Sequence, residues 1–108
     1  MKGKQAHTPT LTITQQDFEN LKKSDKPFIL IDVRTQQERD SYHIGGTLIP
    51  LDQLPLHIDQ FNPEDTLVLY CKSGQRSLIA AHLLYNSGFR NVASLIGGIG
   101  TEMTNKCN

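Results

Sequence analysis

The stretch of sequence that decides the fold is Thr66-Leu67-Val68-Leu69-Tyr70-Cys71-Lys72-Ser73-Gly74-Gln75-Arg76. Its first five residues form a short apolar run, which is typical of a strand buried on both faces of a parallel sheet. The mostly apolar segment from Ser77 to Ser87 then predicts a helix, with Gly88 as its C-cap. The pattern therefore predicts a strand, a loop that contains Cys71 and a helix in direct succession.

The flanking sequence continues this alternation of strands and helices. A second buried strand is predicted over residues 28–33, and shorter strands over 47–49 and 92–95. Helices are predicted after the N-cap Thr14, over residues 35–42 and after Leu51, where Pro55 limits the length. We therefore expect an α/β fold with a mostly parallel sheet. Residues 11–108 are expected to form a single domain, preceded by a flexible tail over residues 1–10.

Composition narrows the class of protein. A chain of 108 residues suits one domain, and 37% apolar with 20% charged residues suits a globular protein. The formal charge of zero excludes an overall basic field that would gather nucleic acid or an anionic membrane. The sequence has no apolar run near the roughly 18 residues of a membrane span, so we expect a cytoplasmic protein without nucleic-acid or membrane partners.

Two cysteines are present, Cys71 and Cys107, which is too few for a disulfide framework. An unpaired interior cysteine is by residue type more often a core residue than a reactive thiol. His7, His57 and His82 show no spacing that suggests a metal site, so neither a metal nor a cofactor is expected.

The neighbours of Cys71 favour reactivity instead. In an open α/β sheet, ligands bind at the carboxyl ends of the strands, where amide groups at helix N-termini point outward. Gly74 permits a tight loop that turns several N–H groups toward its centre. These amides, the helix dipole and the nearby cations Lys72 and Arg76 would all favour a thiolate, which is the nucleophilic form of cysteine. A cationic loop of this kind is also a poor place to bury a thiol.

The segment from Leu69 to Ser77 resembles the active-site loop of the rhodanese family. The segments Gly88-Phe89-Arg90-Asn91-Val92 and Leu95-Ile96-Gly97-Gly98-Ile99 resemble the closing motifs of that family, and Asp32-Val33-Arg34 with Glu38 and His43-Ile44 resembles its opening motif. The resemblance covers residues 28–99, with the motifs in the family's order. It implies a five-stranded, mostly parallel sheet with helices on both faces. It also implies transfer of sulfane sulfur through a persulfide. One departure is that this chain has no Trp, whereas many relatives have one after the Gly-Gly segment.

The resemblance also assigns residues to roles. It implies that Cys71 is the catalytic nucleophile and that the substrate-binding loop consists of Lys72, Ser73, Gly74, Gln75, Arg76 and Ser77. Asp32, Arg34, Glu38 and His43 are interpreted as supporting residues, namely ion-pair, capping or hydrogen-bonded turn residues. The implied partners are a small donor such as thiosulfate and, as acceptor, a thiol or a ubiquitin-like sulfur-carrier protein.

Two other functions remain open from the sequence. Phosphatases of a related fold use a cysteine and an arginine in a similar loop, but that loop is one residue longer than the one between Cys71 and Arg76. A smaller loop suits a single sulfur atom better than a phosphoryl group, and no Asp or His is evident beside it as an acid. A catalytically silent module for binding or regulation is the other alternative, because one fold hosts unrelated functions.

Overall fold

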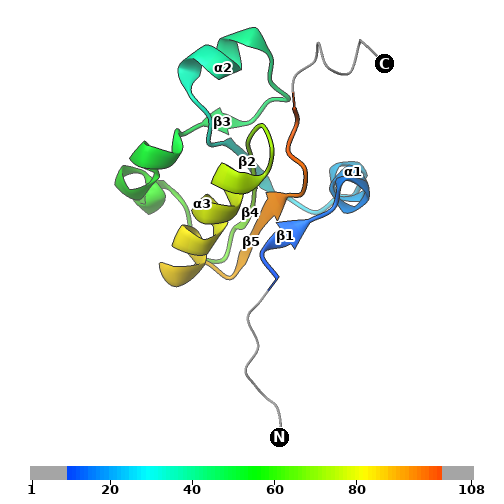
Figure 1. The fold of residues 1–108 in the computed structure, drawn as a ribbon. Helices are drawn as coiled ribbons and strands as arrows, with labels where there is room; N and C mark the ends of the chain where they lie inside the picture. Colours follow the sequence, from blue (N-terminus) through cyan, green and yellow to red (C-terminus); the bar gives the residue numbers. More distant parts are fainter. Residues whose placement is uncertain (1–9, 101–108) are drawn as a thin grey trace, which may run out of the picture.

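The structure is a computed structural model, and it describes residues 10–100. Five parallel strands form one sheet in the order β1-β5-β4-β2-β3 (Figure 1). In chain order the strands are β1 (Thr12–Ile13), β2 (Ile29–Asp32), β3 (Thr47–Leu48), β4 (Thr66–Tyr70) and β5 (Asn91–Leu95). The predicted α/β class with a parallel sheet is therefore confirmed, and β4 lies at the centre of the sheet.

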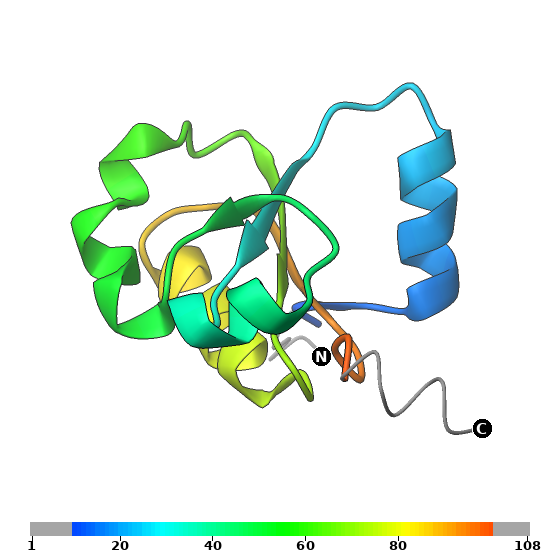
Figure 2. The same ribbon diagram turned by 90° about the horizontal axis from the view of Figure 1, so that it is seen from above.

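Helices cover both faces of this sheet, as expected. Helix α1 (Gln15–Lys23) lies on one side, and α3 (Gln75–Asn86) lies on the other side with the 3₁₀ helices η1 (Leu51–Leu56) and η2 (Ile58–Gln60) (Figure 2). The short helix α2 (Gln36–Ser41) follows β2 at the carboxyl ends of the strands. Within the described range, no helix combines the length and the apolar character that crossing a membrane requires.

Local sequence signals explain where these helices begin. The Thr14 hydroxyl accepts a hydrogen bond from Asp17 N–H at 3.0 Å, which confirms the predicted N-cap of α1. Thr35 and Glu38 form a reciprocal capping box at the start of α2. The segment after Leu51 forms 3₁₀ turns rather than an α-helix, because Pro55 within it has no N–H to donate.

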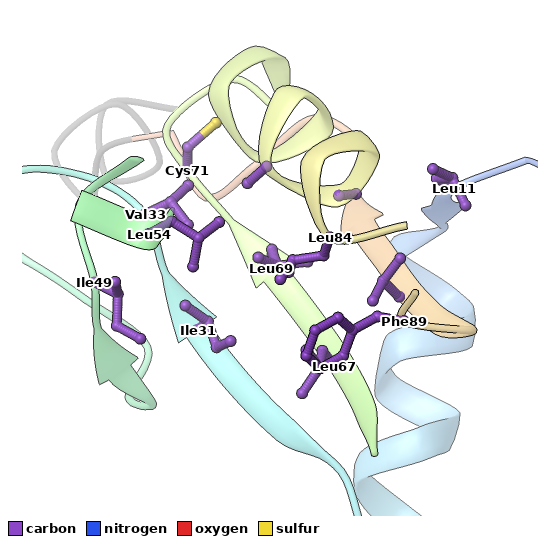
Figure 3. Packing of buried hydrophobic residues seen from close by; sticks show 13 residues of the cluster. Leu11, Ile31, Val33, Ile49, Leu54, Leu67, Leu69, Cys71, Leu84 and Phe89 are labelled. Carbon is purple, nitrogen blue, oxygen red and sulfur yellow. The ribbon is translucent and has the colours of Figure 1, made fainter. Parts of the chain in front are cut away.

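The side chains of β4 alternate between the two faces of the sheet, and this alternation positions the cysteine. Leu67, Leu69 and Cys71 belong to the core cluster on the α3 face, whereas Val68 and Tyr70 point to the α1 face. Figure 3 shows the sulfur of Cys71 at the end of β4, directed toward the loop before α3. The buried members of the α3-face cluster are Leu11, Ile31, Val33, Ile49, Leu54, Leu67, Leu69, Cys71, Ala80, Ala81, Leu84, Phe89 and Val92.

The structure adds one strand to those predicted from the sequence, and predictions about both ends of the chain fall on residues that it does not describe. Strand β1 was not predicted, and it pairs with the outer edge of β5 through Thr12 and Ile13. The first nine residues of the predicted tail and Cys107 lie outside the described residues. The assignment of residues 11–108 to one domain stays a prediction.

Candidate active site

Cys71 lies directly after β4, and the loop that follows it folds back over its sulfur. Gly74 N–H donates to Cys71 Sγ at 3.1 Å, and Ser77 N–H donates to the same atom at 3.3 Å. The Ser77 hydroxyl lies 3.5 Å from the sulfur. The loop therefore surrounds one sulfur atom with backbone and hydroxyl groups that stabilise a negative charge.

Burial and hydrogen bonding act in opposite directions on the pKa of Cys71. Burial, the largest influence, raises the pKa, because it disfavours the charged thiolate. Hydrogen bonds from the Ser77 hydroxyl and from the amides of Ser77, Gly74 and Ser73 lower it, and the net result lies below the ordinary value. The thiolate is thus favoured by neutral hydrogen-bond donors, and within residues 10–100 no histidine hydrogen-bonds to the sulfur.

The position of Cys71 differs from the sequence-based expectation in one respect. A thiol in this loop was expected to be poorly buried, yet Cys71 is 0% exposed and belongs to the apolar core. Cys71 shares its core cluster with residues of β2, β4 and η1, and Figure 3 shows Val33 and Leu54 beside it. Its polar contacts come from Gly74 and Ser77. The core and reactive interpretations of this cysteine are therefore compatible, because the two sides of the side chain have different surroundings.

Two glycines allow the loop to close over the sulfur. Gly74 has φ of +99°, and a Cβ there would lie 3.2 Å from Gly97 N and 3.3 Å from Leu95 O. Gly98 has φ of +63°, and a Cβ there would lie 2.3 Å from Lys72 O. Ile99 and Gly100 also donate backbone hydrogen bonds to the loop carbonyls that Gly98 contacts. Residues 97–100 thus pack against the loop backbone, and the position of Gly98 leaves no room for a Cβ.

Arg76 is paired with an acidic residue rather than left free for an anion. Its Nη1 and Nη2 groups donate to Glu38 Oε1 at 2.7 Å and to Oε2 at 2.8 Å. Glu38 also accepts from Thr35 N–H as part of the capping box of α2. The Arg76 guanidinium is the main reason why the pKa of Glu38 falls from 4.5 to about 2. The Arg76 cation, which was expected to favour the thiolate, is therefore part of a charge-compensated pair.

Asp32 and Arg34 form a second, fully buried pair at the end of β2. Arg34 Nε and Nη2 donate to the two carboxylate oxygens at 2.8 and 2.9 Å, and Arg34 also donates to Tyr42 O at 2.7 Å. Arg39 of α2 donates to Asp32 Oδ2 at 3.4 Å and to Gly46 O at 2.7 Å. These bonds tie β2, α2 and the turn before β3 together, and none of them reaches Cys71.

The remaining residues named from the sequence lie at the surface. Lys72 and Ser73 are exposed on the loop, and Gln75 is exposed at the start of α3. His43 is an exposed turn residue whose Nδ1 accepts from Gly45 N–H at 2.9 Å. Lys72 borders a pocket of about 150 Å³, whose other lining residues are Arg34, Glu38, Ser41, Tyr42 and Gly100. In residues 10–100, no three His, Cys, Asp or Glu side chains are close enough to hold a metal ion.

Sequence reasoning missed one buried polar residue at this site. Ser94 on β5 is 1% exposed, and its hydroxyl lies 2.6 Å from the Ser77 hydroxyl. A serine between Ala93 and Leu95 in a strand is a weak signal, because its role depends on the register of β5 against β4.

Comparison with known proteins places the chain in a family. Residues 14–100 match the model of the rhodanese-like domain. The chain is 31% identical over 88 residues to the putative sulfur carrier protein YrkF of Bacillus subtilis, an alignment that spans 81% of this chain but only 48% of that protein. It is 33% identical over 85 residues to the thiosulfate sulfurtransferase GlpE of Coxiella burnetii, covering 78% of each.

A solved structure supports the same assignment. The crystal structure of a rhodanese-like domain protein from Staphylococcus aureus superposes with a TM-score of 0.75 at 29% identity, covering 84% of this chain and 92% of that one. The family match spans β4, the Cys71 loop and α3, which together hold the sulfur contacts described above. The chain therefore belongs to the rhodanese-like family of sulfurtransferases.

Proposed function

We propose that this protein transfers sulfane sulfur through a persulfide on Cys71. The observation that carries the proposal is the set of donors around Sγ, two backbone amides at 3.1 and 3.3 Å and the Ser77 hydroxyl at 3.5 Å. These groups stabilise an anionic sulfur whether it belongs to a thiolate or to a persulfide.

The first half of the cycle loads the cysteine. The Cys71 thiolate attacks the outer sulfur of thiosulfate, an S–S bond forms at Cys71, and the S–S bond of the donor breaks to release sulfite. The charge is conserved, because a thiolate and a dianion become a persulfide anion and a dianion. A persulfide donor loads the cysteine in the same way and leaves as a thiolate.

The second half of the cycle delivers the sulfur. A thiophilic acceptor attacks the outer sulfur of the persulfide, and Cys71 leaves as the thiolate that the loop stabilises. Cyanide and thiols are acceptors of this kind. A ubiquitin-like sulfur-carrier protein would accept sulfur with the opposite polarity: the outer sulfur of the persulfide attacks its activated C-terminal acyl group, the activating group leaves, and a thiol then cleaves the acyl disulfide to a thiocarboxylate and a mixed disulfide on Cys71. The similarity to a putative sulfur carrier and to a thiosulfate sulfurtransferase supports a role in sulfur transfer.

The phosphatase alternative fits the geometry less well. A phosphatase loop needs its arginine to hold the phosphoryl oxygens, whereas both Nη groups of Arg76 are bound to Glu38. Cys71 is also 0% exposed, which suits attack on a single sulfur atom better than attack on a tetrahedral phosphoryl group.

The experiment is to incubate the protein with thiosulfate and to measure its intact mass. We expect the mass of one added sulfur in the wild-type protein and in Cys107→Ser, and none in Cys71→Ser. A lack of added mass in the wild type, or the same addition in Cys71→Ser, would contradict the proposal. Turnover of thiosulfate with cyanide, compared with hydrolysis of an aryl phosphate, then separates a sulfurtransferase from a phosphatase and from a silent module.

A further inference from the structure

Ser94 is a buried hydroxyl that contacts the site through another hydroxyl. In the register of the sheet it lies opposite Leu69, two residues before Cys71, and its side chain points to the face that α3 covers. Its Oγ lies 2.6 Å from Ser77 Oγ and 3.4 Å from Gly74 O. Burying a hydroxyl group costs free energy unless it is hydrogen-bonded, so each of these two hydroxyl protons needs an acceptor.

The hydrogen bonds can run in two directions, and each direction suits one form of the cysteine. With a thiol, Cys71 S–H donates to Ser77, Ser77 donates to Ser94, and Ser94 donates to Gly74 O. With a thiolate, Ser94 donates to Ser77, and Ser77 donates to the sulfur. Every hydroxyl proton has an acceptor in both arrangements, at the separations of 3.5, 2.6 and 3.4 Å that the structure shows.

Removal of Ser94 would affect the two forms unequally. The Ser77 hydroxyl has a second acceptor, Gly74 O, at 3.3 Å, so with a thiol it can turn to that carbonyl and stay paired. With a thiolate it must point at the sulfur, and it then loses the short hydrogen bond that Ser94 donates. Removal of Ser94 should therefore destabilise the thiolate of Cys71 more than the thiol.

We propose that Ser94 is a positioning residue, which donates to the Ser77 hydroxyl and thereby directs it at the anionic sulfur of Cys71. Ser94 does not touch the reacting atom, and its effect passes entirely through Ser77. This inference rests on the proposed function only in that Cys71 reacts as an anion.

The test measures the pH dependence of alkylation of Cys71 by iodoacetamide in a Cys107→Ser background, where one thiol remains. The rate follows the thiolate fraction, so its pH profile gives the pKa of the thiol. We expect Ser94→Ala to raise this pKa by about 0.5 to 1 unit, the equivalent of one hydrogen bond. In a Ser77→Ala background, the same substitution should leave the pKa unchanged. Circular dichroism and the unfolding midpoint check that each variant is folded.

A second pair of variants separates the hydroxyl from side-chain volume. Ser94→Thr keeps the hydroxyl and Ser94→Val replaces it with a methyl group of similar size, so only the valine variant should shift the profile. An unchanged profile in Ser94→Ala, or an equal shift with and without the Ser77 hydroxyl, would overturn the inference. Because alkylation requires no sulfur donor, this outcome is independent of whether thiosulfate loads Cys71.

Discussion

The pairing of Arg76 with Glu38 predicts that an uncharged residue at position 38 will speed the reaction of Cys71 with anions. Glu38→Gln is the suitable change, because glutamine can still accept from Thr35 N–H in the capping box. The substitution removes the negative charge and leaves the Arg76 guanidinium uncompensated beside the loop. Anionic reagents should then be attracted to the site, and neutral reagents should not.

The magnitude follows from the exposure of the pair. The side chains of Arg76 and Glu38 are 36% and 29% exposed, so solvent screens their interaction, and pairs of this kind contribute about 0.2–1 kcal/mol. If the released attraction acts on an approaching anion to the same extent, the rate should rise by roughly 1.4- to fivefold, since about 1.4 kcal/mol corresponds to a factor of ten. The gain should shrink at high ionic strength.

The assay compares two alkylating reagents that differ in charge. Alkylation of Cys71 is measured with iodoacetate, which is anionic, and with iodoacetamide, which is neutral and corrects for any change in thiolate fraction. We expect the ratio of the two rates to rise about 1.4- to fivefold in Glu38→Gln. Persulfide formation from thiosulfate should increase in parallel.

The double variant Glu38→Gln with Arg76→Gln is the control, and it should return the ratio to the wild-type value. An equal change with both reagents would show that Glu38 acts on the shape of the loop rather than on its charge. A gain that survives the loss of Arg76 would refute the reasoning.

Three further predictions concern stability. Because Arg76 holds the pKa of Glu38 near 2, against 4.5 when unpaired, the pair stabilises the fold above pH 4.5 and stops doing so as the pH falls toward 2. The difference in urea unfolding free energy between wild type and Glu38→Gln, about 1 kcal/mol after screening, should therefore disappear over that range. Asp32→Asn should cost about 3–5 kcal/mol in the same assay, since it leaves the buried Arg34 without its counter-charge, and a cost below 1 kcal/mol would contradict this account. Gly98→Ala should lower the unfolding midpoint more than Gly88→Ala, because both positions have positive φ but only Gly98 faces backbone atoms within 4 Å; equal losses would show that packing against the loop is unimportant.

The sequence predicts the central part of this fold well, because its signals there are local. The apolar run before Cys71 and the helix after it are each specified by neighbouring residues, and the cap at Thr14 depends on contacts only three residues away. Strand β1 was not predicted, because two residues are too few to show the alternation of apolar and polar residues in a strand. Its pairing with β5 is also a contact between residues far apart in the sequence.

The relations within the site were harder to predict, because they join distant parts of the chain. The pair of Glu38 and Arg76 spans 38 positions, and nothing in either local pattern shows that they meet. Cys71 is buried in a cluster that includes Ile31 of β2 and Leu54 of η1, which the loop sequence does not contain. The contact of Ser94 with Ser77 requires the exact register of β5, which no residue pattern specifies.

The groups that hold the sulfur all belong to one continuous β-α-β unit. Cys71 directly follows β4, and Ser77 and Ser94 lie within α3 and β5, whereas Glu38 comes from α2, much earlier in the chain. Contacts between residues that are close in sequence form with a smaller loss of loop-closure entropy than contacts between distant residues. We therefore expect the sulfur-binding loop to form early in folding, as a local unit, and the charge of Arg76 to be compensated only later, when α2 docks.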